Sequence, residues 1–130
     1  MSVSKLAPES VALRFVEVIN AGDSEGLVKL QTEDFTLVDT GGDVFRGRSG
    51  WQDYFSAYPN YRIHAQHVLT SGSGVAIIGK TTGSHVSPEV EEHETVLWTA
   101  EIRDGLVSEW RIYSDIKETK KKVQESHQDR

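Results

Sequence analysis

Asp39 is the carboxylate in this sequence whose position most suggests acid–base chemistry. Phe35 to Asp39 is predicted to form a brief apolar strand, and the aspartate ends it. A carboxylate that faces an apolar cavity can act as a general base, whereas an aspartate at a strand end commonly starts a turn. The stretch TGGD that follows is such a turn signal. Position alone therefore leaves both interpretations of Asp39 open.

Two further titratable residues end predicted strands. Asp115 ends the last run, and strict alternation places it on the face opposite Trp110, so that a bulge would be needed to turn it inward. His85 ends an earlier run, on the face of Ile77 and Thr81. It could act as a proton shuttle or a polar anchor, or it could lie on the surface.

The other histidines and acidic residues do not predict a metal site. His64 and His67 are three positions apart in a predicted strand and therefore lie on opposite faces. Glu91 and His93 share a face, but two ligands do not close a site, and a solvated, charged strand edge is the better interpretation. GxSxG, HExxH and a glycine-rich phosphate loop do not occur in the sequence. We expect no metal and no cofactor, so any chemistry would be proton transfer or water activation by carboxylates.

Several aromatic side chains could surround a flat or cyclic apolar ligand. The helix predicted after Gly47 carries aromatic rings at i, i+3, i+4 and i+7, on one face. The predicted strands that contain Trp98 and Trp110 place each indole on the same face as other apolar residues. Such stripes more often pack a core than line a pocket. The candidate ligand-binding residues are Phe15, Tyr54, Phe55, Trp98 and Trp110.

Helices and then long strands must position these residues. Apolar residues recur at helical spacing from Pro8 to Asn20, and Asp23 can cap a second short helix. The period then changes to two in four runs, which are Tyr61 to Ser71, Gly74 to His85, Val90 to Arg103 and Leu106 to Asp115. Asp104-Gly105 is the strongest hairpin signal. This order predicts an α+β fold in which a curved antiparallel sheet wraps around the N-terminal helices as a cone.

Length and charge limit the classes of function. The chain has 130 residues, 37% of them hydrophobic, which suits one domain over residues 1–116. Residues 117–130 carry one large apolar residue and are predicted to be a charged, disordered tail. The net charge of −6 disfavours nucleic acid as a partner. No apolar segment suits a signal peptide or a membrane span, so we expect a cytoplasmic protein.

Residues 8–115 resemble the nuclear transport factor 2 superfamily, which shares a cystatin-like α+β cone. The segments NAGD and GLV, followed by Asp34 and Asp39, are similar to the first half of the ketosteroid isomerases. The segment FRG before an aromatic helix, and IRDGLVSEWRIYSD near the end, are similar to the SnoaL-like polyketide cyclases. The resemblance implies a homodimer, for which outward residues such as Leu97 and Tyr113 could form the seam.

The resemblance also implies roles for individual residues. Asp39 matches the aspartate that serves as the base in the isomerases, and Asp115 lies where SnoaL-like relatives often carry an acidic residue. The two oxyanion donors of the isomerases are missing, because Phe15 occupies the tyrosine position and Trp98 the acid position. Loss of one such donor commonly costs about 2.7–4 kcal/mol, which argues against steroid isomerase activity.

Two functions from different classes remain open, besides association with a larger protein through the open sheet face, which the resemblance implies. The first is a cofactor-independent isomerase, cyclase or hydrolase that acts on a small apolar or aromatic molecule by carboxylate acid–base catalysis. The second is a non-catalytic module that binds a ligand or forms a dimer, and the missing oxyanion donors favour it. The orientation of Asp39 and the presence of a second polar group near the same ligand atom would distinguish them.

Overall fold

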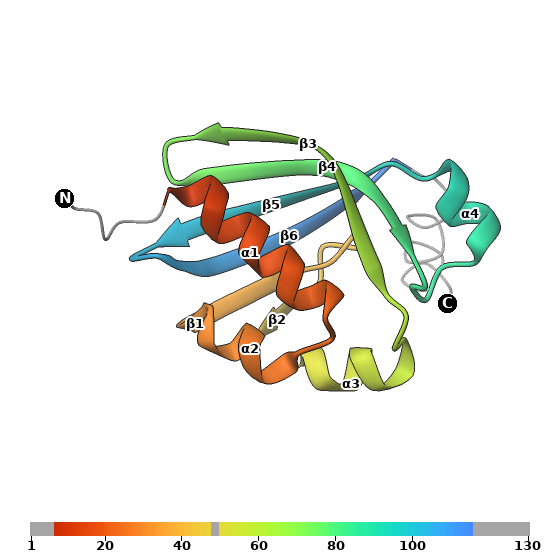
Figure 1. Cartoon of the computed structure of the whole chain (residues 1–130), viewed down its shortest axis with the longest axis horizontal. Helices are drawn as coiled ribbons and strands as arrows, with labels where there is room; N and C mark the ends of the chain where they lie inside the picture. Colours follow the sequence, from red (N-terminus) through yellow and green to blue (C-terminus); the bar gives the residue numbers. More distant parts are fainter. Residues whose placement is uncertain (1–6, 48–49, 116–130) are drawn as a thin grey trace, which may run out of the picture.

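A computed structural model describes residues 7–47 and 50–115, which form four helices and six strands (Figure 1). The helices are α1 (Pro8–Asn20), α2 (Ser24–Lys29), α3 (Trp51–Ala57) and α4 (Pro88–His93). The strands are β1 (Gln31–Val38), β2 (Val44–Arg46), β3 (Arg62–Ser71), β4 (Gly74–Thr82), β5 (Val96–Arg103) and β6 (Leu106–Ser114). The predicted tail, residues 117–130, lies outside the described residues. None of the helices in the described ranges is long and apolar enough to cross a bilayer.

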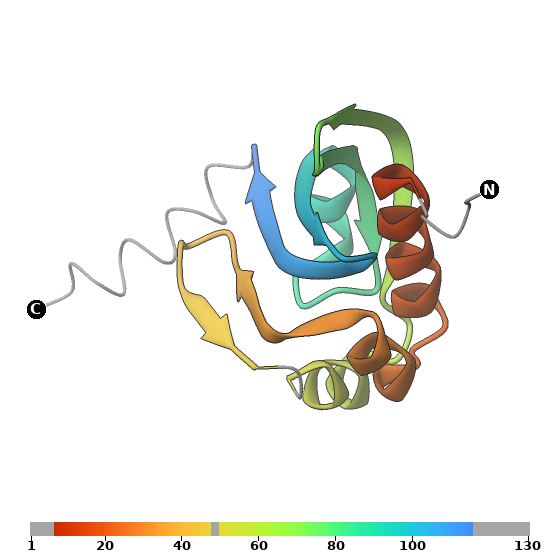
Figure 2. The same ribbon diagram turned by 90° about the vertical axis from the view of Figure 1, so that its left-hand side faces the viewer.

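All six strands belong to one curved sheet, in the order β2-β1-β6-β5-β4-β3. Neighbouring strands are antiparallel except β1 and β6, which pair in parallel with Leu37 beside Trp110. Figure 2 shows the sheet curling around α1, with α2 and α3 at its lower edge. The predicted α+β cone is therefore confirmed, although the sequence pattern gave no sign of the parallel pair.

The predicted helix start and hairpin turn both have the expected geometry. Asp23 precedes α2, and its Oδ1 accepts a hydrogen bond from the Gly26 N–H at 2.9 Å. Asp104 and Gly105 both have positive φ angles, 56° and 77°, as a tight hairpin between β5 and β6 requires.

The core lies between α1 and the concave face of the sheet. Along β5 the predicted inward set Val96, Trp98, Ala100 and Ile102 is buried throughout. From α1, Phe15 is fully buried against the sheet, and its ring centroid is 4.7 Å from that of Trp110. Aromatic packing therefore fills the interior of the cone around this helix.

The interpretation of Val90 to Arg103 as one strand was wrong, because α4 precedes β5. Ser87 caps α4 by accepting a hydrogen bond from the Val90 N–H, and Pro88 occupies the first turn, where its missing N–H costs nothing. The interpretation of Glu91 and His93 as part of a solvated strand edge was also wrong, since they lie in α4 and Glu91 is only 4% exposed. The preceding strand ends at Thr82 rather than His85, because Gly83 turns the chain with φ +72°.

Candidate functional site

Asp39 lies directly after β1, where its side chain holds the turn to β2. Its Oδ1 accepts hydrogen bonds from the backbone N–H groups of Gly41 and Asp43, both at 3.0 Å. The backbone N–H of Asp39 also donates to the Asp43 carbonyl at 3.0 Å. These contacts are those of a turn-forming aspartate. The role of Asp39 as a general base stays a prediction.

Asp115 is exposed at the end of β6, where it pairs with the residue before β5. Its Oδ1 accepts a hydrogen bond from the Thr95 N–H at 2.8 Å, and its own N–H donates to the Thr95 carbonyl at 3.2 Å. The register of β5 and β6 shifts only between Glu101 and Ile102, at the far end of the hairpin. No bulge at this end therefore turns Asp115 inward, and its role as a second acid or base stays a prediction.

The candidate aromatic residues divide into two groups. Phe15, Trp98 and Trp110 are at most 1% exposed and belong to the packed core. Tyr54 and Phe55, from α3, are half-buried at the edge of that core. A small molecule approaching from solvent would therefore meet Tyr54 and Phe55 before the three core rings.

Tyr54 and His85 are 31 positions apart in sequence and form a hydrogen-bonded pair. The tyrosine Oη lies 3.0 Å from His85 Nδ1, and the His85 backbone N–H donates to the same oxygen at 3.3 Å. Because Oη accepts from that N–H, its own hydrogen is available for Nδ1 when the imidazole proton resides on Nε2. The structure thus joins one predicted proton carrier, His85, to one predicted ligand-binding residue.

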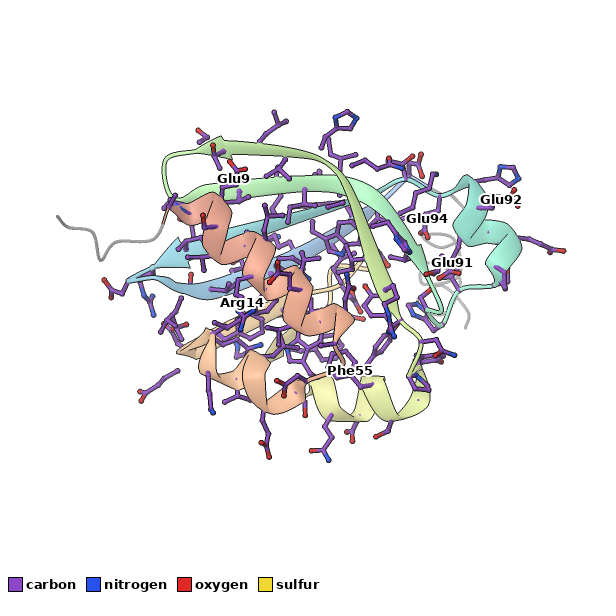
Figure 3. All side chains as sticks on the ribbon, in the orientation of Figure 1. Glu9, Arg14, Phe55, Glu91, Glu92 and Glu94 are labelled. Carbon is purple, nitrogen blue, oxygen red and sulfur yellow. The ribbon has the colours of Figure 1, made fainter. Side chains whose placement is uncertain are left out.

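Two buried carboxylates lie near this pair. Glu91 belongs to α4, and Glu94 is the residue that follows α4. Glu91 and Glu94 are each 4% exposed, and Figure 3 shows both on the side of α4 that faces the sheet, while Glu92 points away. Glu91 Oε2 accepts hydrogen bonds from Thr81 Oγ1 at 3.2 Å and from the Ser84 N–H at 2.9 Å. Glu94 Oε2 accepts from Ser114 Oγ at 2.5 Å.

The hydroxyl groups of Tyr54 and Tyr61 are close enough to these carboxylates to be affected electrostatically. Burial raises the pKa of Tyr54 to about 12, against an opposing hydrogen bond from His85, and the charges of Tyr58, Glu91 and Glu94 raise it further. Burial also raises the pKa of Tyr61 well above its usual range, with Tyr54 and both glutamates adding to the effect. Both hydroxyls therefore stay protonated at neutral pH and can donate hydrogen bonds.

The indole of Trp98 adds an unpaired donor to this group. Its Nε1 is buried and has no hydrogen-bond partner in the described part of the chain. The indole N–H lies on the side of the Tyr61 hydroxyl and works against the rise in the pKa of Tyr61, but it does not complete a hydrogen bond to it. We call the group of Tyr54, Tyr61, His85, Glu91, Glu94 and Trp98 the α3–α4 cluster.

Sequence reasoning missed Glu91, Glu94 and Tyr61 as members of a site. The spacing of Glu91 and Glu94, three positions apart, was a usable signal, because one helical turn brings Glu91 and the residue that caps the helix end close together. The capping pattern of Ser87 and Pro88 was the signal for that helix. Among the described residues, no group of three or more His, Cys, Asp or Glu side chains could hold a metal ion.

Comparison with known proteins agrees with this architecture. IdmH from Streptomyces antibioticus, a suspected polyketide cyclase, is 24% identical, with a TM-score of 0.69 over 92% of this chain and 99% of that chain. A protein of unknown function with a cystatin-like fold from Xanthomonas campestris is 18% identical, with a TM-score of 0.73 over 91% and 97%. A suspected ketosteroid isomerase from Kribbella flavida is 18% identical, with a TM-score of 0.68 over 84% and 78%.

At these identities the solved structures show the fold alone. No curated protein matches the sequence significantly. The SnoaL-like domain family, however, matches residues 12–110, which run from α1 to Trp110 in the last strand. The chain therefore belongs to the SnoaL-like domain family, related in fold to the polyketide cyclases and ketosteroid isomerases.

Proposed function

We propose that this protein is a cofactor-independent enzyme that moves protons on a small apolar or aromatic molecule at the α3–α4 cluster. The observation that carries the proposal is the hydrogen bond between Tyr54 and His85 beside two buried carboxylates. The four residues come from separate parts of the chain, namely α3, the segment after β4, α4 and the residue that follows α4. Side chains of these types, brought together in this way, are typical of acid–base sites.

The chemical roles follow from the donors and acceptors present. The carboxylates of Glu91 and Glu94 accept hydrogen bonds only from neutral donors among the described residues, so either carboxylate is available to accept a proton from carbon or water. When His85 carries protons on both ring nitrogens, Tyr54 can give its hydroxyl proton to a substrate oxygen and take the Nδ1 proton of His85 in its place. The set is suited to isomerisation, aldol-type cyclisation or hydrolysis, in which one group removes a proton while another protonates an oxygen.

The substrate class is proposed from the surroundings of the cluster and from its relatives. The half-buried Tyr54 and Phe55 offer aromatic contact area at the edge of the core. Two of the similar structures are described as a suspected polyketide cyclase and a suspected ketosteroid isomerase. Cyclic ketones, polyketide-like aromatics, epoxides and lactones are therefore the first compounds to test.

Tyr54→Phe and His85→Gln are expected to lower turnover of any substrate found in that panel by about 10²–10⁴-fold, the usual contribution of a positioned acid or base. Tyr113→Phe and His67→Gln are matched controls, because Tyr113 is 45% exposed on the outer sheet face and His67 is exposed on β3. Turnover is measured by product formation, and ligand binding is measured separately by thermal shift.

The proposal fails if the Tyr54 and His85 variants turn over substrate as fast as the two controls do. Asp39→Asn belongs in the same series, because Asp39 is the predicted base from the family resemblance. If turnover is lost in Asp39→Asn alone, the reaction takes place at the end of β1 instead of at the α3–α4 cluster.

A second candidate function, a dimeric module without catalysis, is supported by the outer face of the sheet. Leu69 is 61% exposed and Tyr113 45% exposed. Leu97 lies directly opposite Tyr113 in the β5–β6 register, so the two share this face. We propose that a second copy of the chain covers this surface, since an apolar sheet face is seldom left open.

We expect a dimer in sedimentation velocity at micromolar concentration. Tyr113→Glu is expected to shift the protein to monomer, because it places a charge on the proposed seam. Phe45→Glu is the control, since Phe45 is 55% exposed on β2, at the opposite edge of the sheet from β3. A wild-type protein that sediments as a monomer would contradict the proposal.

A further inference from the structure

The buried charge of Glu91 and Glu94 has no cationic partner among the described residues. The described part of the chain contains three ion pairs, and neither glutamate takes part in one. The pairs are Arg14 with Glu17, Arg103 with Asp34, and Arg111 with Glu109. Both buried carboxylates bond through Oε2 to neutral donors, and no described residue donates to either Oε1. Fully buried glutamates are rare unless they are paired, so this arrangement requires an explanation.

The nearest lysine does not supply the missing charge. Lys80 Nζ donates to the backbone carbonyls of Glu94 at 3.0 Å and of Glu92 at 3.3 Å. The ammonium group thus stabilises the end of α4, where the helix dipole is negative, instead of pairing with a carboxylate. Within the described part of the chain, the two carboxylates therefore have no countercharge.

Aromatic rings gather around Tyr54, whose hydroxyl is within electrostatic reach of Glu91 and Glu94. The Tyr54 ring centroid lies 4.8 Å from that of Tyr58, 5.1 Å from that of Tyr61 and 5.9 Å from that of His85. The π-faces of tyrosine rings attract cations, particularly where water is excluded. The carboxylates and the aromatic rings of this cluster therefore both favour a positively charged ligand.

The fully buried Trp98 indole N–H needs a hydrogen-bond acceptor, which is a second and independent indication of a ligand. Its N–H has no acceptor among the described residues, although buried polar groups are nearly always paired. It lies on the side of the Tyr61 hydroxyl, and Tyr61 packs against Tyr54. An oxygen atom of a ligand placed within hydrogen-bond reach of this N–H would satisfy the donor.

We infer that the ligand of the α3–α4 cluster is an organic cation, with a protonated amine held by Glu91 and Glu94 and an oxygen acceptor directed at Trp98. The inference rests on the proposed function, because it adds a protonated amine to the cyclic substrate proposed for the same site. The negative net charge of the chain, −6, assists the approach of such a ligand.

Three related probes test the two halves of this inference by calorimetry at neutral pH. The first, 4-(dimethylamino)cyclohexanone, has both the charge and the oxygen. The second, 4-isopropylcyclohexanone, has the same shape without the charge, and the third, N,N-dimethylcyclohexylamine, has the charge without the oxygen. The aminoketone is expected to bind at least about tenfold more tightly than each of the other two probes. The neutral ketone lacks the contact between ammonium and carboxylate, and the plain amine lacks an acceptor for the buried indole N–H.

Isosteric variants test whether the two carboxylates are responsible. Glu91→Gln and Glu94→Gln are expected to abolish the preference for the aminoketone over the neutral ketone. Glu92→Gln is the matched control, because Glu92 is exposed and points away on the same helix (Figure 3). Circular dichroism and a melting curve verify that each variant is folded.

Each outcome decides the inference. Equal binding of charged and neutral ketones by the wild type overturns it, and so does a folded Glu91→Gln/Glu94→Gln double variant that keeps the preference. No binding of the aminoketone at millimolar concentration also overturns it. If the neutral ketone binds and its conversion depends on Tyr54 and His85, the proposed function stands while the inference on charge fails.

Discussion

Phe15→Ala is expected to lower the free energy of unfolding by about 3–5 kcal/mol, the range for removing a large buried ring. Phe15 is 0% exposed, and its ring centroid lies 4.7 Å from that of Trp110, 5.8 Å from that of Trp51 and 6.2 Å from that of Phe35. Truncation would leave a cavity between α1 and the sheet, because three surrounding rings cannot all move into the space. Urea unfolding followed by tryptophan fluorescence measures the loss.

This result would decide between two interpretations of Phe15, as core residue and as pocket wall. A ring that lines a hydrated pocket has fewer contacts to lose, so its truncation would cost less than about 1.5 kcal/mol. Phe45→Ala is the control, because Phe45 is 55% exposed, and its change should stay within about 0.5 kcal/mol. A small loss in both variants would contradict the packed interior described above.

Local sequence signals were sufficient for most of the elements. The apolar spacing of Pro8–Asn20 gave α1 with its bounds, because a helix that buries one face must repeat with the helical period. Alternation along β5 identified the buried face that carries Trp98, because successive side chains of a strand point to opposite faces of the sheet. Asp104-Gly105 located the last hairpin, since few other residues adopt the positive φ angles that it requires.

The α4 segment could not be assigned from periodicity alone. A six-residue helix has fewer than two turns, so Glu91 and His93 fit an alternating pattern as well as a helical one. Burial of Glu91 depends on Thr81 and Ser84, which donate hydrogen bonds to its carboxylate only after β4 and α4 have packed together. Hydropathy patterns assign charged residues to the surface, and this one is an exception because of tertiary hydrogen bonds.

The candidate site was only partly predictable for a related reason. His85 and Tyr54 were each identified, but their pairing depends on where the segment after β4 passes α3, which no local pattern encodes. Asp39 fitted two local patterns equally well, a strand end facing a pocket and the first residue of a turn. In the structure the Asp39 carboxylate accepts hydrogen bonds from the N–H groups of Gly41 and Asp43. Only a three-dimensional structure could reveal these contacts.

Gly83→Ala is expected to destabilise the protein by at least about 3 kcal/mol and to separate His85 from Tyr54. Gly83 has φ +72°, and an added Cβ would lie 2.3 Å from the Asn60 carbonyl oxygen and 3.0 Å from the Tyr61 N. Those atoms are backbone, so no side-chain rotation can relieve the contact. The segment that carries His85 would have to move away from the chain that leads to Tyr61.

Gly72→Ala is the control that separates the backbone strain of a positive φ angle from the steric clash of the added Cβ. Gly72 also has positive φ, +58°, but an added Cβ would meet nothing within 4 Å. Both variants share the cost of about 1–2 kcal/mol for a left-handed alanine, so any further loss in Gly83→Ala measures the contact with Asn60. The NMR chemical shifts of the His85 ring follow its separation from the Tyr54 ring, 5.9 Å away, which the control should not cause. Equal melting temperatures for the two variants would mean that the end of β4 adapts freely. In that case the backbone contact at Asn60 does not fix the position of the α3–α4 cluster.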